Sequence, residues 1–110
     1  MSGEFAGTLN QRIVLERPAT ARTPMGLRDH GWEIFGRCLA AIVPEGAGAE
    51  SEAMALSAMP RFRVTIRARE GVAIDQRLRW AGRTLMIRQL LSDPRARDRL
   101  VLRCEEVREP

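Results

Sequence analysis

Residues 61–69 have the sequence RFRVTIRAR, and this stretch decides the fold class. Its apolar and polar residues alternate strictly. The apolar set is Phe62, Val64, Ile66 and Ala68. Because successive side chains of a strand point to opposite faces, this pattern predicts a strand with one buried and one polar face. Such one-sided burial is typical of antiparallel sheets.

Weaker versions of the same pattern flank this stretch on both sides. We expect further strands over residues 11–17, 32–43, 78–80, 84–91 and 100–107. Turn-forming residues separate the later strands, at Gly71, Ala81-Gly82-Arg83 and Asp93-Pro94. Trp32, Ile34, Cys38 and Ile42 are expected on one side of their strand, which Gly36 bends and Pro44 ends. About six strands predict an all-β fold, a small antiparallel barrel or sandwich.

Three segments lie outside this strand pattern. Residues 1–10 are small and polar and are expected to form a flexible N-terminal arm. Residues 18–31 are expected to form a long loop or an open hairpin. Residues 44–59 form either a projecting loop or a short helix that Ser51 would cap, and an extended segment is the main alternative. We expect one domain over residues 1–110.

The charge comes entirely from one kind of base. All 18 basic residues are arginine, and the acidic residues leave a net charge of +4. Arginine suits forked pairing with carboxylates across an interface or with phosphates, and both interpretations remain open at this point. The chain has no apolar run near the ~20 residues of a membrane helix, so we expect no membrane association.

Residues that carry catalysis or bind metals are few. His30, Cys38 and Cys104 lack the spacing of a metal site, and no glycine pattern matches a phosphate or dinucleotide loop. We therefore expect no enzyme, no metal and no cofactor. The two cysteines are expected to be small buried hydrophobic residues, and Trp32 and Trp80 to lie in the core.

The order of these motifs resembles the phage head–tail joining family, also called head completion proteins. The first half carries LNQRIVLERP at 9–18 and GWEIFGRCLAAIVPEGAGAESEA at 31–53. The second half carries RFRVTIRAR at 61–69 and LRWAGRTLMIRQLLSDPRARDRLVLRCEEV at 78–107. The resemblance covers about residues 9–107 and rests on order and spacing together. The stretch EGAGAE at 45–50 departs from the bulkier residues usual in the family.

The resemblance implies a β-barrel subunit of a homo-oligomeric ring, a hexamer or dodecamer. The ring would lie at the head–tail interface of a virion or phage-like particle, such as a gene transfer agent, assembled in the bacterial cytoplasm. Its partners would be the portal-side adaptor and the tail terminator, with double-stranded DNA passing through the lumen without sequence-specific binding. Adaptor and stopper positions remain open, and the absence of long helices favours the stopper. The family offers no catalytic residue and no cofactor.

A ring subunit needs lateral contacts, and the polar face of the 61–69 strand is one candidate. We expect inter-subunit contacts between Arg61, Arg63, Arg67 and Arg69 and a neighbour's Glu45, Glu50 and Glu52. A channel or gating loop is expected around Gly46, Gly48, Glu50 and Met54. The arginine face has two other interpretations, a solvated surface and a phosphate-binding strip. The latter would make the chain a small β-barrel nucleic-acid-binding module. A minor enzyme or accessory domain with an unrecognised site is the third hypothesis.

Overall fold

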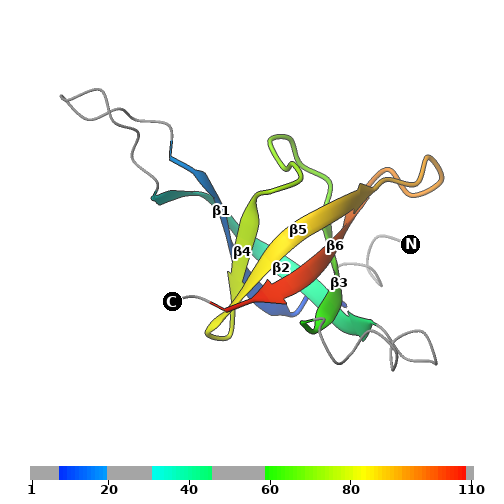
Figure 1. Ribbon diagram of the computed structural model, residues 1–110. Helices are drawn as coiled ribbons and strands as arrows, with labels where there is room; N and C mark the ends of the chain where they lie inside the picture. The colour runs from blue at the N-terminus through cyan, green and yellow to red at the C-terminus, as the bar shows by residue number, and fades with distance from the viewer. Residues whose placement is uncertain (1–7, 20–30, 46–58, 109–110) are drawn as a thin grey trace.

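The strands of this chain close into one antiparallel barrel, in a computed structural model that describes residues 8–19, 31–45 and 59–108. The strands are β1 (Gln11–Pro18), β2 (Trp32–Glu45), β3 (Arg61–Arg67), β4 (Arg77–Trp80), β5 (Arg83–Leu91) and β6 (Arg99–Val107). Their order around the barrel is β1-β2-β3-β6-β5-β4 (Figure 1). The predicted all-β fold is confirmed. Most of the N-terminal arm and of the 44–59 segment, including the possible helix, lies outside the described residues.

Strand β2 is the longest and connects the two halves of the barrel. Its first part pairs with β1 and its second with β3, and Ala40 faces Gln11 on one side and Ile66 on the other. It continues through Pro44 to Glu45, two residues beyond the predicted end. Among the described residues no strand pairs with this edge of β2 past Ala40 on the β1 side, so a proline without an N–H is tolerated there.

The predicted irregularity near Gly36 is a β-bulge. Leu15 pairs with Gly36 but Glu16 pairs with Ile34, so Phe35 is the extra residue. An extra residue reverses the side on which the following residues point. The prediction that Trp32 and Ile34 share the buried side of Cys38 is therefore wrong: Ile34 is 48% exposed, and the Arg77 guanidinium lies 4.3 Å from the Trp32 ring centroid.

Inward-facing aliphatic side chains from all six strands fill the barrel. Ala40 of β2 is fully buried, and the largest fully buried side chains are Ile13, Leu15, Val64, Ile66, Leu78, Leu85, Ile87 and Leu102. Trp80 packs against them as predicted, and its ring meets Phe62 edge to face at 5.5 Å. Cys104 is buried and Cys38 half-buried, and both are free thiols. This interior leaves functional contacts to the outer wall and the ends.

The seam between β1 and β4 closes the barrel over only three residue pairs. At this seam Arg77 donates to Glu16 at 2.6 Å, and both side chains are about 85% buried (15% and 13% exposed). The Arg77 guanidinium also covers Trp32. This ion pair is shielded from water and joins paired residues across the shortest seam. It therefore helps to hold the barrel closed.

Two described connections lie at the same end of the barrel, at the top of Figure 1. They are residues 68–76, between β3 and β4, and residues 92–98, between β5 and β6. The Ala68 N–H donates to the Asp98 carbonyl at 3.0 Å and so joins them. The opposite end carries the two-residue β4–β5 turn, where Ala81 and Gly82 both have positive φ, as a tight right-twisted hairpin requires.

Candidate functional site

The outer face of β3 carries the predicted arginines, and the structure shows what each one contacts. Arg61, Arg63 and Arg67 lie on the strand and are exposed, and Arg69 follows two residues after its end. Val64 and Ile66 face the core between them, so strand alternation alone places all three guanidinium groups outside. The predicted arginine face is thus present in the structure, and its arginines contact different sets of residues.

Glu45 is the centre of one part. Its carboxylate accepts from Arg63 Nη2 at 3.2 Å and from Arg103 Nε at 3.2 Å, and the Glu45 side chain is only 14% exposed. Arg63 and Arg103 lie directly opposite each other on β3 and β6. Like charges in that position repel, so the carboxylate between them removes a repulsion as well as forming two pairs. Glu45 therefore contacts Arg63 of its own chain; a contact with a neighbour's arginine stays a prediction.

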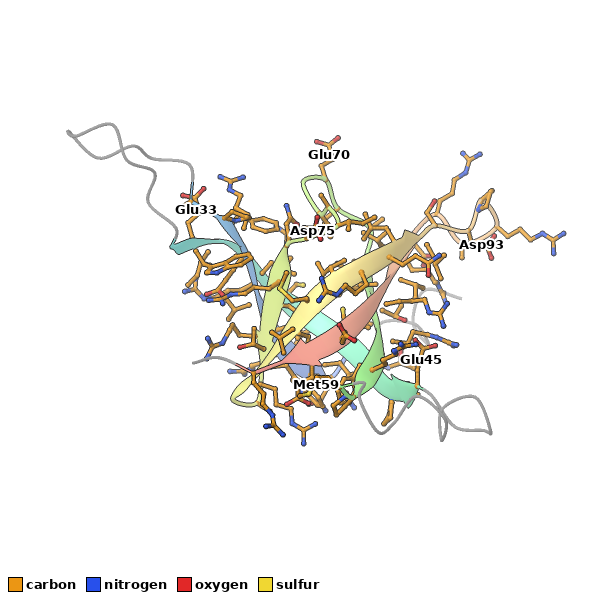
Figure 2. The ribbon with its side chains drawn as sticks, viewed as in Figure 1. Glu33, Glu45, Met59, Glu70, Asp75 and Asp93 are labelled. Carbon is orange, nitrogen blue, oxygen red and sulfur yellow. The ribbon has the colours of Figure 1, made fainter. Side chains whose placement is uncertain are left out.

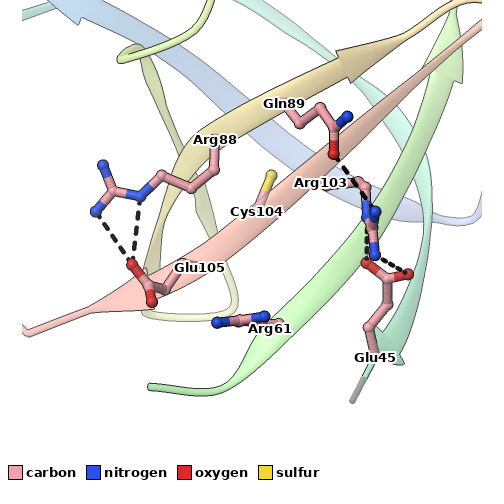
Figure 3. A pocket seen from close by; sticks show the side chains of 7 residues that line it. All are labelled: Glu45, Arg61, Arg88, Gln89, Arg103, Cys104 and Glu105. Atoms are coloured by element: carbon pink, nitrogen blue, oxygen red, sulfur yellow. Dashed lines mark hydrogen bonds and ion pairs between the residues drawn. The ribbon is translucent and has the colours of Figure 1, made fainter. Parts of the chain in front are cut away.

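An open groove of about 570 Å³ runs beside this centre (Figure 3). Its lining residues are Glu45, Arg61, Arg88, Gln89, Arg103, Cys104 and Glu105. Arg88 pairs with Glu105 at 3.1 Å, and Arg61 lies in register between Glu45 and Glu105. Within the described part of the chain, Arg61 forms no ion pair. Three arginines and two glutamates leave the groove positive, which favours an anionic partner group.

Arg69 lies apart from the rest of the face and reaches toward β2. A Cβ atom at Gly36 would lie 2.5 Å from Arg69 Nη2, so the absence of a side chain at the bulge makes room for this guanidinium. Burial raises the pKa of the nearby Cys38 thiol, while the charge of Arg69 and its hydrogen bond oppose that rise. Burial raises the pKa of Cys104 to about 12. Both thiols are therefore protonated, and unreactive as nucleophiles, near neutral pH.

Sequence reasoning missed several residues of this surface, namely Arg88, Gln89, Arg103 and Glu105. Arg103 and Glu105 alternate with buried Leu102 and Cys104, so the outward pattern of β6 was a usable signal. The remaining predicted residues, Gly46, Gly48, Glu50, Glu52 and Met54, lie outside the described residues. Within residues 8–19, 31–45 and 59–108, no three His, Cys, Asp or Glu side chains gather as metal ligands. No helix in those ranges is long and apolar enough to cross a membrane.

Comparison with known proteins adds the biological context of this barrel. The model of the phage head completion protein family matches residues 6–107. The solution structure of protein SF1141 from Shigella flexneri 2a is similar, with 27% identity and a TM-score of 0.72, covering 94% of this chain and 97% of that one. A chain from the virion of a native gene transfer agent particle shares the fold at 22% identity and a TM-score of 0.62, covering 90% and 96%. No curated protein matches the sequence.

These observations agree on a structural role in a tailed particle. The match spans all six strands of the barrel, and head completion proteins are structural proteins of the virion that associate with other head and tail proteins. The resemblance found in the sequence is confirmed at the level of the family. This chain belongs to the phage head completion protein family.

Proposed function

We propose that this chain is a ring subunit of the head–tail connector, acting as stopper or adaptor between the portal complex and the tail. The observation that carries this proposal is the family match over residues 6–107. The surface supports it: Leu39 and Val43 on the outer face of β2 are 48% and 54% exposed, and Val43 lies opposite Arg63 of β3. Exposed apolar residues next to arginine are typical of protein–protein contacts.

The stopper position is the better fit to the described architecture. All the elements of residues 8–19, 31–45 and 59–108 that support the barrel are strands, with no long helix to span a neighbouring ring. Contacts that repeat by rotation close a ring when each subunit offers two different complementary surfaces. The ring would be a hexamer or dodecamer, with double-stranded DNA in its lumen.

The gating role is proposed for the connection between β2 and β3. This connection, with Gly46, Gly48, Glu50 and Met54, is longer than most loops between neighbouring strands, and long connections usually have a function. Deleting residues 46–52 is expected to release packaged DNA from particles that still contain the subunit. Normal DNA retention and tail attachment by this deletion would refute the gating role.

Deletion of the coding sequence from a particle-producing strain tests the function as a whole. We expect tailless heads whose DNA is lost or open to nuclease, and we expect purified wild-type chain, added during assembly, to restore DNA protection and tail attachment. Electron microscopy with a nuclease-protection assay reads out both effects. Tailed, DNA-retaining particles from the deletion strain would refute the proposal.

The alternative, a nucleic-acid-binding barrel, finds less support in the aromatic residues. Phe62 and Trp80 pack against each other, and Trp32 lies under Arg77. Base stacking needs exposed aromatic faces beside the positive strip. Affinity for a short DNA duplex distinguishes the two functions: a binder would bind tightly at low salt and lose affinity steeply as salt rises. We expect weak binding at any salt concentration.

A further inference from the structure

The outer wall of β2, β3, β6 and β5 carries its side chains in rows that run across the strands. Ala41, Thr65, Val101 and Leu91 follow one another in register and form an uncharged row. The side chains of this row point outward, because Val64, Ile66 and Leu102 beside them are fully buried. Leu91 is 39% exposed, and Leu39 and Val43 extend the apolar surface along β2. We call this surface the striped wall.

Arginine rows border the uncharged row on both sides. Arg63 and Arg103 lie opposite each other on one side, and Arg67 and Arg99 on the other. Arg67 follows Arg63 by four positions on β3, so the two rows lie about 13 Å apart at about 3.3 Å per residue. Arg63 and Arg103 share the single carboxylate of Glu45, and Arg67 has no ion-pair partner within the described residues. Arg99 pairs with Asp98 at 3.4 Å, so each border carries two arginines against one carboxylate. The striped wall is thus an apolar centre between two borders of net positive charge.

The connection between β3 and β4 has the complementary pattern. Ile74 is 52% exposed, and the carboxylates of Glu70 and Asp75 on this connection form no ion pair within the described residues. Glu70 points away from the barrel at the tip of the connection (Figure 2). Along the chain Ile74 lies between two acids, and this order of charge and apolar surface is complementary to an apolar row between two rows of bases. We call residues 70–75 the acidic knob.

The acidic knob is ordered by a set of hydrogen bonds that hold Ile74 in the open. Gln76 donates to the Gly71 carbonyl at 2.9 Å and accepts from the Ala73 N–H at 2.8 Å. The Asp75 N–H donates to the Ile87 carbonyl at 3.0 Å, and Asp75 has φ +72°. Exposing a large apolar side chain to water is unfavourable in the isolated subunit. Because the loop is already ordered, less conformational entropy is lost when Ile74 docks.

We propose that the acidic knob of one subunit docks on the striped wall of the next, as a head-to-tail contact between copies of this chain. Ile74 would cover the uncharged row, while Glu70 and Asp75 face the two arginine borders. Knob and wall are different surfaces, so the contact is heterologous and repeats around a ring. The inference rests on the proposed ring function and assigns its lateral contact.

Concentration-dependent NMR of the full chain tests the docking directly. Backbone amide spectra from about 20 µM to about 1 mM cover the range of a weak single contact. We expect progressive shifts at Glu70, Ile74 and Asp75 together with Thr65, Val101 and Leu91. No shifts up to about 1 mM, shifts on the wall without the knob, or shifts confined to another surface would each overturn the proposal.

Two matched variants test whether the contact depends specifically on Ile74. Ile74→Ser should weaken self-association at least about tenfold, because the exposed isoleucine loses its buried state in the contact. Ile34→Ser removes an isoleucine of similar exposure from the part of β2 that pairs with β1, outside the paired rows of the striped wall, and should leave self-association unchanged. Sedimentation equilibrium measures both variants. An equal or larger effect of Ile34→Ser would overturn the assignment.

Charge reversal tests the pairing of knob and wall. Glu70→Arg alone and Arg67→Glu alone should each weaken self-association several-fold, and a mixture of the two variants should associate more tightly than either. A mixture no tighter than the single variants would contradict the pairing. Complementation of the deletion strain distinguishes failure of the docking proposal from failure of the proposed function. If an Ile74→Ser chain restores tails to the particles as well as wild type, the docking is refuted and the connector function stands.

Discussion

The ion pairs of Glu45 allow a quantitative test of the outer surface. Glu45→Gln keeps the shape of the side chain and removes the charge between Arg63 and Arg103. The two arginines are about half exposed, at 55% and 48%, so each pair is worth at most about 1 kcal/mol after screening by solvent. The unrelieved repulsion across the strand pair adds a few tenths of a kcal/mol. We expect a loss of about 1–2 kcal/mol in the free energy of unfolding.

Urea unfolding near neutral pH, at low and at high salt, measures this loss. The difference between wild type and Glu45→Gln should shrink at high salt, because ions screen both the attraction and the repulsion. Glu70→Gln is the matched control, since Glu70 forms no ion pair within the described residues, and its effect should stay within about 0.5 kcal/mol. Equal stabilities of Glu45→Gln and wild type, or a loss that salt does not reduce, would refute the reasoning.

Three further predictions concern the barrel itself. Arg77→Met keeps packing on Trp32 but removes the partner of the shielded Glu16 carboxylate. Urea unfolding should therefore show a loss of about 2–4 kcal/mol in the free energy of unfolding. A loss below about 1 kcal/mol would contradict the role of the pair in closure. Arg69→Gln removes the charge that lowers the pKa of Cys38, so alkylation of that thiol in the folded chain should slow at a given alkaline pH, and an unchanged rate would argue against the contact. The Cys104 thiol has a pKa of about 12 when folded, against 9.0 otherwise. Its stabilising effect is therefore complete below about pH 9 and is lost as pH rises toward 12. Ionisation of this thiol should lower the free energy of unfolding by about 2 kcal/mol between about pH 8 and about pH 10.5. Cys104→Ala should remove that part of the difference.

Local alternation predicted the strands because burial of one face repeats every two residues. The 61–69 pattern is the clearest case, and the observed β3 follows it to Arg67. The prediction failed at Trp32, where one extra residue at the bulge changed the side of the strand. A bulge depends on how β1 and β2 pair, so a single strand's pattern cannot fix its consequences.

The contacts of the site were harder to predict than its strands. Glu45 meets Arg103 across a sequence separation of 58 residues, and only the pairing of β2 with β3 and of β3 with β6 brings them together. From the sequence we expected these arginines to pair with carboxylates of a neighbouring subunit. Glu45 lies at the end of β2, where strand register brings it to Arg63 of the same chain, and its contact with a neighbour's arginine stays a prediction. Register is set by the whole barrel, which is why residue types alone could not assign these partners.

A reconstruction of the head–tail junction of the parent particle tests the central claim most directly. We predict a symmetric ring of this six-stranded barrel between the portal-side adaptor and the tail, with DNA in its lumen. The acidic knob of each subunit should contact the striped wall of the next. A junction that lacks this barrel, or a barrel that lies elsewhere in the particle, would contradict the account.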